Sequence, residues 1–287
     1  MTVANVTKRL NNREGSQTIR AILAAVLIVS AFVSVFPFLY MLALSLMETS
    51  TMKLSWERLM TATYTLDNYR MAFKQGEFIR YIKNSTIITL YAVVVNCLIS
   101  AMAAYAFAKK KFCGSRTMYT IYLATMMVPG QVTLIPTFLL LKEMGMLNTY
   151  SAIALPTCGA FGVLLIYSFM KQGIPDDLLE AADLDGCGEM RKFTRIVLPL
   201  LKSVIISLAI FTFINVWGNL VLPLIVTTDS DMTTITLAVA NMKTSHTATK
   251  YGYIMAGNVI AFLPPFILYL FLQKQFVEGI ALSGTKM

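Results

Sequence analysis

The chain has 287 residues, of which 56% are hydrophobic and only 14% are charged, and its formal net charge is +9. Soluble domains carry about 25% charged residues, so this composition excludes an ordinary water-soluble globule. The 24 basic and 15 acidic residues all lie outside six long apolar blocks. This pattern indicates one membrane domain rather than the two aqueous domains that the length alone suggests.

The six charge-free blocks predict six membrane-spanning helices. A helix rises about 1.5 Å per residue and satisfies its own backbone polar groups, so about 20 residues cross the hydrocarbon layer. Buried helices of a large soluble protein are the alternative, but they give shorter runs interrupted by charges. The predicted fold class is therefore an all-α, polytopic membrane protein. Its expected helices are residues 21–47, 84–108, 118–141, 151–170, 203–228 and 251–273.

Basic residues indicate how these helices are oriented. The segment 1–20 is basic, and the first block is too long for a signal-peptide core, so we expect it to be retained as a helix. An even number of spans places the tail 274–287 on the same side, and clusters at Lys109–Lys111 and Arg191–Lys192 mark that side as cytoplasmic. The outer loop 48–83 also carries basic residues and weakens this bias. The positive charge suits anionic lipid headgroups, and no nucleic acid partner is expected.

No catalytic or metal-binding arrangement is predicted. The four cysteines, Cys97, Cys113, Cys158 and Cys187, lack paired metal-ligand spacing, so neither a metal site nor a disulfide is expected. His246 lies in the outer loop 229–250 without a nearby acidic or cysteine partner. Both long outer loops, 48–83 and 229–250, are long enough to contact an external partner.

The longest inner segment, 171–202, predicts two short helices beneath the membrane. Pro175 followed by two aspartates suits a helix start, so a helix is expected from about Pro175 to Asp185, ended by Gly186. Its apolar stripe consists of Leu178, Leu179, Ala182 and Leu184. A second helix is expected from Glu189 to about Leu198, because Pro199 cannot continue the hydrogen-bond ladder.

This segment carries a family resemblance. Glu180, Ala181 and Ala182, then Gly186, then Ile196 to Pro199 resemble the EAA loop of permease subunits of binding-protein-dependent ABC importers. The carbohydrate branch of that family, in particular its maltose-type second permease subunit, is resembled over nearly the whole chain. The stretches that carry this second resemblance are 65–69 (TLDNY), 84–85, 134–138 (LIPTF), 145–149 and 275–279.

The resemblance implies a coupling role for the loop between the fourth and fifth helices. In that family the loop inserts into a cleft of an ATPase subunit, where Glu180 would pair with a basic residue and Gly186 would permit a sharp turn. The plainer alternative is that Glu180 is a solvated helix residue and Gly186 an ordinary helix stop. The expected coupling residues are Glu180, Ala181, Ala182, Asp185, Gly186, Ile196, Leu198 and Pro199.

The same resemblance implies the assembly. The tail 279–286 reads GIALSGTK and only superficially resembles a phosphate-binding loop, so no nucleotide site is expected in this chain, and ATP and Mg²⁺ belong to partner subunits. One coupling loop serves one ATPase, so two ATPase subunits imply a second, non-identical permease subunit. An extracytoplasmic sugar-binding protein completes the expected set, and the location is the bacterial cytoplasmic membrane.

A sugar path through the membrane needs neutral amides and aromatic faces. Asn215 and Asn219 are four residues apart and share a helix face. These amides are equally explained as interhelical hydrogen bonds, worth about 0.6 to 2 kcal/mol each. The candidate path residues are Asn96, Gln131, Asn215, Trp217, Asn219 and Asn258.

The predicted function is import of a sugar or oligosaccharide, driven by ATP hydrolysis on a separate subunit; the chain itself is not an enzyme. Two alternatives stay open from the residues alone. A secondary, ion-coupled carrier is disfavoured because the charge-free blocks contain no Asp, Glu or His that could relay protons. A structural membrane scaffold is the other.

Overall fold

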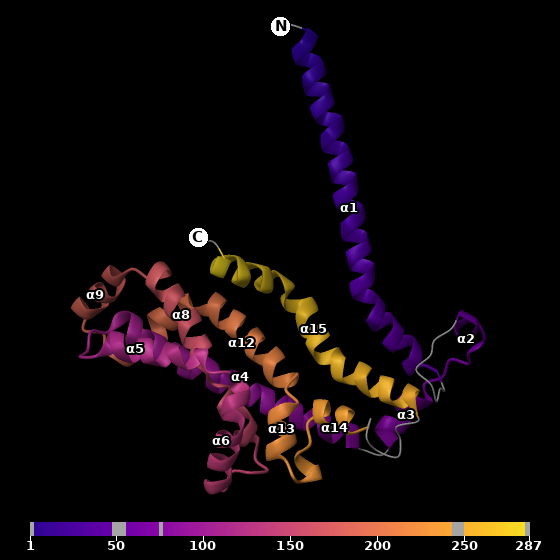
Figure 1. Cartoon of the computed structure of the whole chain (residues 1–287). Coiled ribbons are helices and arrows are strands. Elements are labelled where there is room, and N and C mark those ends of the chain that lie inside the picture. Colours follow the sequence, from indigo (N-terminus) through magenta and orange to yellow (C-terminus); the bar gives the residue numbers. More distant parts are fainter. Residues whose placement is uncertain (1–2, 48–55, 75–76, 243–249, 285–287) are drawn as a thin grey trace. The chain divides into compact units, whose positions relative to one another are not determined.

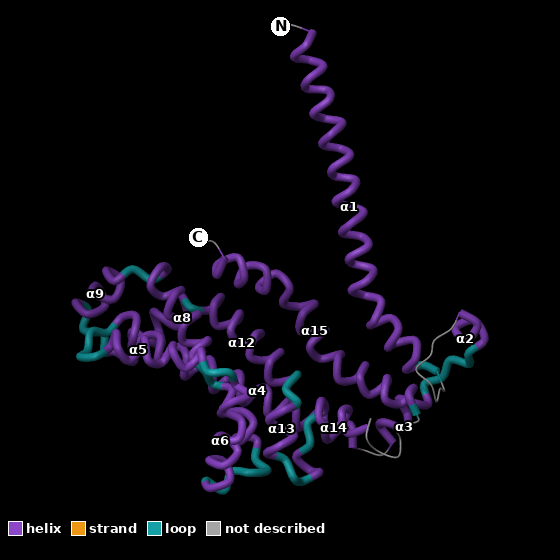
Figure 2. Tube along the Cα trace, in the orientation of Figure 1, coloured by secondary structure: helices purple, strands orange, loops and turns teal. Residues whose placement is uncertain are grey.

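The computed structural model describes residues 3–47, 56–74, 77–242 and 250–284 (Figure 1). Across these ranges the regular elements are helices joined by loops (Figure 2). The one β-type contact in these ranges is an isolated bridge between Met47 and Tyr64. The all-α prediction is therefore confirmed. The chain divides into two units, the first formed by Met1–Met71 with Ala248–Val259 and the second by Ala72–Thr247 with Ile260–Met287.

The α-helices follow one another through the described chain, with single 3₁₀ turns at 125–127, 155–157 and 230–232 and a π-helical turn at 193–197. Their bounds are α1 Val3–Ser45, α2 Trp56–Thr61, α3 Asp67–Lys74, α4 Glu77–Lys109, α5 Ser115–Ala124, α6 Gly130–Glu143, α7 Tyr150–Ala154, α8 Ala160–Gly173, α9 Asp176–Leu184, α10 Glu189–Lys192, α11 Leu198–Leu200, α12 Lys202–Trp217, α13 Val221–Val226, α14 Ile235–Met242 and α15 Tyr251–Gly284.

The candidate membrane spans are of two kinds. Three unbroken helical stretches are long and apolar enough to cross a membrane: Ile19–Ser45, Glu77–Lys109 and Tyr251–Gln273. Three further pairs pass the same test only when a bent pair counts as one span. These pairs are Ser115–Met127 with Gly130–Glu143, bent by 103°, Tyr150–Thr157 with Ala160–Gly173, bent by 45°, and Glu189–Leu200 with Lys202–Trp217, bent by 77°. The described chain thus offers three to six spans.

The breaks correct the expectation of continuous helices over 118–141, 151–170 and 203–228. Val128 adopts extended backbone, with ψ of 118°, because a residue before proline is driven out of the helical region. Pro129, with ψ of 133°, is the N-cap of α6. In the second pair, Cys158 and Gly159 are extended after the turn that contains Pro156. In the fifth block α12 ends at Trp217, and α13 is a separate helix.

In the first unit, Asn68 joins the end of α1 to α3. Its buried amide donates to the carbonyls of Ser45 at 2.9 Å and Met47 at 3.0 Å. A Cβ on Gly252, near the start of α15, would lie 2.2 Å from the Met47 carbonyl oxygen, so these backbones are in direct contact. The TLDNY stretch therefore has a structural role. By contrast, the apolar window of Ile19–Ser45 has none of its residues buried inside the chain.

The core of the second unit lies between α4, α8 and α12. Small residues of α4, including Ala101 and Ala104, are fully buried against Val163 and Ile166 of α8. A Cβ on Gly162 would lie 2.3 Å from the Ser100 hydroxyl oxygen. Small side chains let membrane helices approach closely, and this is the contact that aligns α4 with α8.

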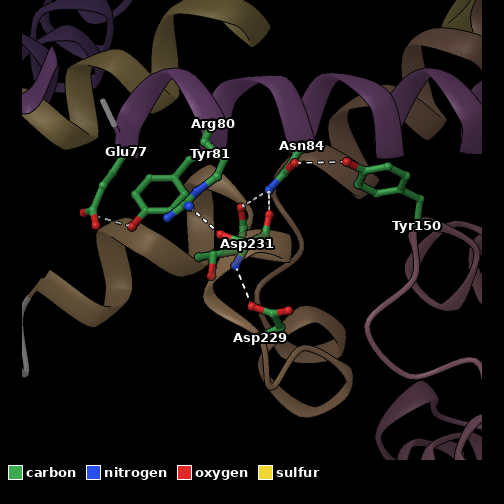
Figure 3. Close-up of polar contacts among 8 residues, drawn as sticks. Glu77, Arg80, Tyr81, Asn84, Tyr150, Asp229 and Asp231 are labelled. Carbon is green, nitrogen blue, oxygen red and sulfur yellow. Dashed lines mark hydrogen bonds and ion pairs between the residues drawn. The ribbon is translucent and has the colours of Figure 1, made fainter. Parts of the chain in front are cut away.

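A polar cluster fixes the segment 229–233 to the start of α4 (Figure 3). The Asn84 amide donates to the carbonyls of Asp231 at 2.7 Å and Thr233 at 3.0 Å, and its oxygen accepts from the Tyr150 hydroxyl at 3.2 Å. Arg80 forms an ion pair with Asp231. The connection between α13 and α14 is thereby held at one end of the α4 helix.

Candidate functional site

Helix α9 occupies the predicted position, one residue shorter at each end. Two aspartates stand in its first turn, where the helix dipole favours negative charge. Gly186 adopts a φ of 72°, and the bonds from Cys187 N to Ala182 O (2.9 Å) and from Gly186 N to Asp183 O (3.0 Å) close the helix. This is the usual C-terminal end of a helix, in which a glycine adopts a left-handed backbone conformation that other residues rarely adopt.

The α9 helix buries one edge and presents the other. Leu179 and Ala182 are 7% exposed and pack toward the second unit's core, whereas Leu178 is exposed and Leu184 is 91% exposed. Two residues of the predicted apolar stripe are therefore buried within the chain, and the other two are exposed. Glu180, Ala181, Asp185 and Gly186 are exposed as well. Within the described residues, Glu180 has neither a hydrogen bond nor an ion pair, so its carboxylate is available to a partner.

A buried lysine holds the two halves of this segment together. Lys192 is 1% exposed, and its ammonium contacts Asp183 of α9 at 2.5 Å and Glu189 of α10 at 2.6 Å. Glu189 in turn contacts Lys110 at 2.5 Å and accepts from the Tyr105 hydroxyl at 2.9 Å. We call these five side chains the clamp. Sequence reasoning used Lys192 only as a marker of membrane side and missed this role.

A second ion pair attaches the beginning of α9 to the same end of α4. Lys109 is almost fully buried, and its ammonium donates to Asp176 at 2.6 Å and to the Ile174 carbonyl at 2.5 Å. The Lys109 ammonium lowers the pKa of Asp176. Since the clamp binds α9 through Asp183 as well, the helix is fixed to α4 near both of its ends.

Glu189 and Lys192 of the clamp are both ionised near neutral pH. Hydrogen bonds from Lys110 and Lys192 lower the pKa of Glu189 from 4.5 to about 2, and Asp183 and Glu189 raise the pKa of Lys192 above its usual range. A carboxylate with a lowered pKa stabilises the fold above its unfolded value and loses this effect as pH falls through the folded value. The stabilisation from Glu189 is therefore complete above about pH 5 and is lost toward pH 2.

Replacing Lys192 by methionine tests the clamp. The side chain stays long and apolar, but its ion pairs with Asp183 and Glu189 are lost. Hydrogen bonds to charged groups contribute about 1.5–3 kcal/mol, and the half-exposed carboxylates place this case at the lower end. We expect faster amide hydrogen exchange across α9. Lys202→Met, at an exposed lysine, is the matched control; equal exchange in both variants contradicts the clamp.

The second half of the loop departs from its prediction. The helical path ends at Leu200, two residues beyond the predicted end, because α10, the π-helical turn 193–197 and α11 follow one another directly. The wide π turn ends at Val197, two residues before Pro199, whose ring disfavours a regular α-helical turn. Val197 is buried, Ile196 and Leu198 are partly buried, and Pro199 is exposed. The spacing of apolar and polar residues does not distinguish a single π turn from an α-helical turn, so the sequence does not predict it.

A cavity of about 410 Å³ lies within the second unit, where α6 and α8 begin and α12 ends. Asn96, Asn215 and Asn219 of the predicted path line it. The structure does not bring the other three candidates to it. Gln131 lies next to the lining residue Gly130, the Trp217 indole donates to the Ala261 carbonyl at 2.9 Å, and Asn258, in the first unit, donates to the Ile254 carbonyl at 2.8 Å.

The cavity combines an aromatic surface with neutral polar groups. The rings of Phe161 and Phe211 lie 4.4 Å apart between centroids, and both line the cavity. The Asn215 amide nitrogen donates to the Phe211 carbonyl at 2.8 Å, so its oxygen faces no protein donor among the described residues. Thr133 and Thr137 add hydroxyl groups, and no ionisable residue is among the described lining residues. Sequence reasoning missed this ring pair, because Phe161 and Phe211 come from different helices.

Metal and nucleotide chemistry finds no support in the described ranges. These residues contain no cluster of three or more His, Cys, Asp or Glu side chains able to hold a metal ion. The four cysteines are free. The stretch from Gly279 to Gly284 is part of helix α15 rather than a loop, while His246 and residues 285–287 lie outside the described residues.

The chain has long apolar helices and a cavity lined by apolar and neutral polar residues. It also has an exposed acidic helix, α9, held outside the charge-free segments. These features define a polytopic membrane transport subunit. The chain belongs to the family of binding-protein-dependent transport system inner membrane components, whose sequence profile matches residues 96–281.

Curated relatives agree with this membership, and a solved structure has a similar fold. The chain is 31% identical to the arabinooligosaccharides transport system permease protein AraQ of Halalkalibacterium halodurans, over 89% of this chain and 92% of the relative. It is also 31% identical to the lactose transport system permease protein LacG of Rhizobium radiobacter, with the same coverages. A crystal structure of a bacterial ABC transporter that imports the acidic polysaccharide alginate has a similar fold, with a TM-score of 0.79, 21% identity and coverages of 91% and 98%.

Proposed function

We propose that this chain is one permease subunit of an importer that moves a sugar or oligosaccharide into a bacterial cell. ATP hydrolysis on two separate ATPase subunits drives the movement, a second, non-identical permease subunit completes the pore, and an external sugar-binding protein delivers the substrate. Family membership supports the importer class, and the named relatives of arabinooligosaccharide and lactose systems support the sugar class.

Six spans with both termini in the cytoplasm fit this role. The two bent pairs that begin at Ser115 and Tyr150 then count as one broken crossing each, and α12 with α13 forms the fifth crossing. The loop 171–202, which includes α10 and α11, lies on the cytoplasmic side. Broken helices are tolerated at membrane depth only where the freed backbone groups are buried in protein or line a cavity. The breaks at Pro129–Gly130 and at Gly159 meet this condition, since Gly130 and Gly159 line the cavity.

The observation that carries the coupling proposal is the geometry of α9. Glu180 and Leu184 are exposed on α9. The same helix is attached through Asp176 to Lys109 of α4 and through Asp183 to Lys192 of α10. An exposed acidic residue beside an exposed leucine suits a partner surface with an apolar cleft and a basic rim. We assign that surface to the ATPase subunit, with the contacts made by Glu180, Ala181, Leu184, Asp185 and Gly186.

The cavity is the proposed part of the sugar path in this subunit. An exposed ring face stacks on the apolar face of a pyranose or furanose, and amides and hydroxyls bind its hydroxyl groups. Phe211, Asn215 and Thr133 supply these groups from two different helices. The segment 229–233 is bound to the first turns of α4, at the end away from α9 (Figure 3). We propose this segment as the contact for the external binding protein.

Uptake by the reconstituted assembly tests the function. In proteoliposomes that hold both permease subunits and the ATPase, labelled sugar should accumulate only with ATP inside and the loaded binding protein outside. Replacing Phe211 by alanine removes the ring face proposed to stack on the sugar. If that contact is comparable to an aromatic pair, about 0.5–1.5 kcal/mol, the KM for uptake should rise by about 2–10-fold. Phe271→Ala, an exposed ring outside this cavity, is the control. Uptake driven by an ion gradient without any ATPase contradicts the proposal.

A further inference from the structure

A second cavity, of about 520 Å³, lies between the end of α4 and the start of α5 in the second unit. Its lining is dominated by charge. The ionisable lining residues are Lys109, Lys110, Lys111, Arg116, Lys171 and Asp176. Five cations therefore face one carboxylate. The general preference for basic residues at the cytoplasmic membrane edge accounts for their presence in this loop, but it does not account for their convergence on one cavity.

Three of these cations are not neutralised by the protein. Lys109 is paired with Asp176, and Lys110 with Glu189. Among the described residues, Lys111, Arg116 and Lys171 form no ion pair, and the nearest recorded contact of Lys171 is with the face of the Tyr167 ring, at 5.9 Å. Like charges that converge on a concave surface raise the local concentration of anions.

The backbone at the same place also favours an anion. Helix α5 begins at Ser115, and the preceding Gly114 has a φ of 77° and provides no side-chain cap. Gly114, Ser115 and Thr117 line the cavity with Arg116, so the positive end of the α5 dipole is directed at it. The cations and the uncapped helix end thus contribute independently to one anion-binding surface.

The surroundings select the kind of anion. Phe112, at the cavity wall, is 41% exposed, and Met118 and Ile121 of α5 are 54% and 63% exposed. Met118 and Ile121 are three residues apart and share one face of the helix. Exposed apolar side chains next to a cationic cavity fit a molecule with a phosphate at one end and a hydrocarbon chain at the other.

We propose that this cavity binds the headgroup phosphate of an anionic phospholipid, with an acyl chain along Phe112, Met118 and Ile121. The inference rests on the proposed membrane placement of α4 and α5 but not on the transported substrate. Because Asp176 of α9 lines the same cavity, the bound lipid lies beside the ion pair that attaches α9 to α4. The bound lipid would thereby help to hold α9 in position next to the membrane surface.

The test measures lipid retained by the intact permease–ATPase assembly in native mass spectrometry. The probe is dioleoylphosphatidylglycerol, compared with dioleoylphosphatidylcholine. We expect Lys111→Gln with Arg116→Gln to weaken phosphatidylglycerol binding by about tenfold or more, since each basic group contributes to the attraction. The matched double variant Arg195→Gln with Lys202→Gln removes two exposed cations outside the cavity and should bind as the native assembly does.

Three results overturn the proposal. Equal losses in the two double variants mean a diffuse surface attraction rather than a site. Displacement of the lipid by millimolar inorganic phosphate means that the cavity takes a free anion. Loss of the ATPase subunit from the Lys111/Arg116 variant, with lipid binding retained, means a protein-docking surface. Failure of sugar uptake in the native assembly bears on the proposed function alone, because lipid retention is measured without transport.

Discussion

Replacing Glu180 by lysine is expected to abolish the coupling of ATP hydrolysis to transport while the chain still inserts in the membrane. Glu180 is exposed and unpaired in the described part of this chain, so its reversal leaves the fold intact and acts on the partner. Disrupting a charge pair that becomes buried at an interface costs about 2–5 kcal/mol. Hydrolysis stimulated by the loaded binding protein should therefore fall by at least about 30-fold.

The control for this variant is Glu143→Lys, which makes the same charge change at an exposed glutamate at the end of α6. Its stimulated hydrolysis and its co-purification with the ATPase should match those of the native assembly. Unchanged hydrolysis in Glu180→Lys refutes the coupling role. Equal loss in both variants indicates a general effect of added positive charge.

The second large effect is expected at Gly252, where alanine should destabilise the first unit. Its added Cβ would lie 2.2 Å from the carbonyl oxygen of Met47 and 2.7 Å from the amide nitrogen of Asn68. Overpacking usually costs about 1–3 kcal/mol, and here a backbone atom blocks the new methyl, so relief by side-chain rotation is excluded. The thermal midpoint of the purified assembly should fall by at least about 5 °C.

Gly188→Ala is the matched control for this stability measurement. Gly188 has a φ of −64° and a ψ of 155°, which alanine adopts readily, and nothing lies within 4 Å of its added Cβ. Its thermal midpoint should stay within about 1 °C of the native value, since surface substitutions without a special contact change stability little. A Gly252→Ala midpoint equal to that of the control contradicts the close packing of α15 on the end of α1.

The sequence located most helical segments but not their breaks. Charge-free blocks identify apolar stretches well, because a single ionised group in lipid is so unfavourable. Hydropathy indicates which residues are apolar but not the direction of the helix axis, so it does not predict the 103° bend at Pro129. Helix α9 was predicted to within one residue at each end, because Pro175 and Gly186 limit a helix through backbone geometry alone.

The candidate site was predictable only where it depends on local spacing. Asn215 and Asn219 share one helix face, and both line the cavity. Phe161 and Phe211 were missed, because their rings meet only through the packing of α8 on α12. Lys192 was missed for a related reason: a lysine in a cytoplasmic loop is ordinarily exposed, and its burial depends on Asp183 and Glu189 lying around it.

Helix α4 connects the proposed sugar cavity to the proposed coupling helix α9. Helix α4 carries Asn96 at the cavity and, thirteen residues later, Lys109 beside α9. At about 1.5 Å per residue these positions are about 20 Å apart along the axis, and no loop interrupts them. If a partner tilts α9 while its ion pair with Lys109 holds, α4 must tilt with it. Asn96 then moves as well, so the same motion changes the shape of the cavity wall.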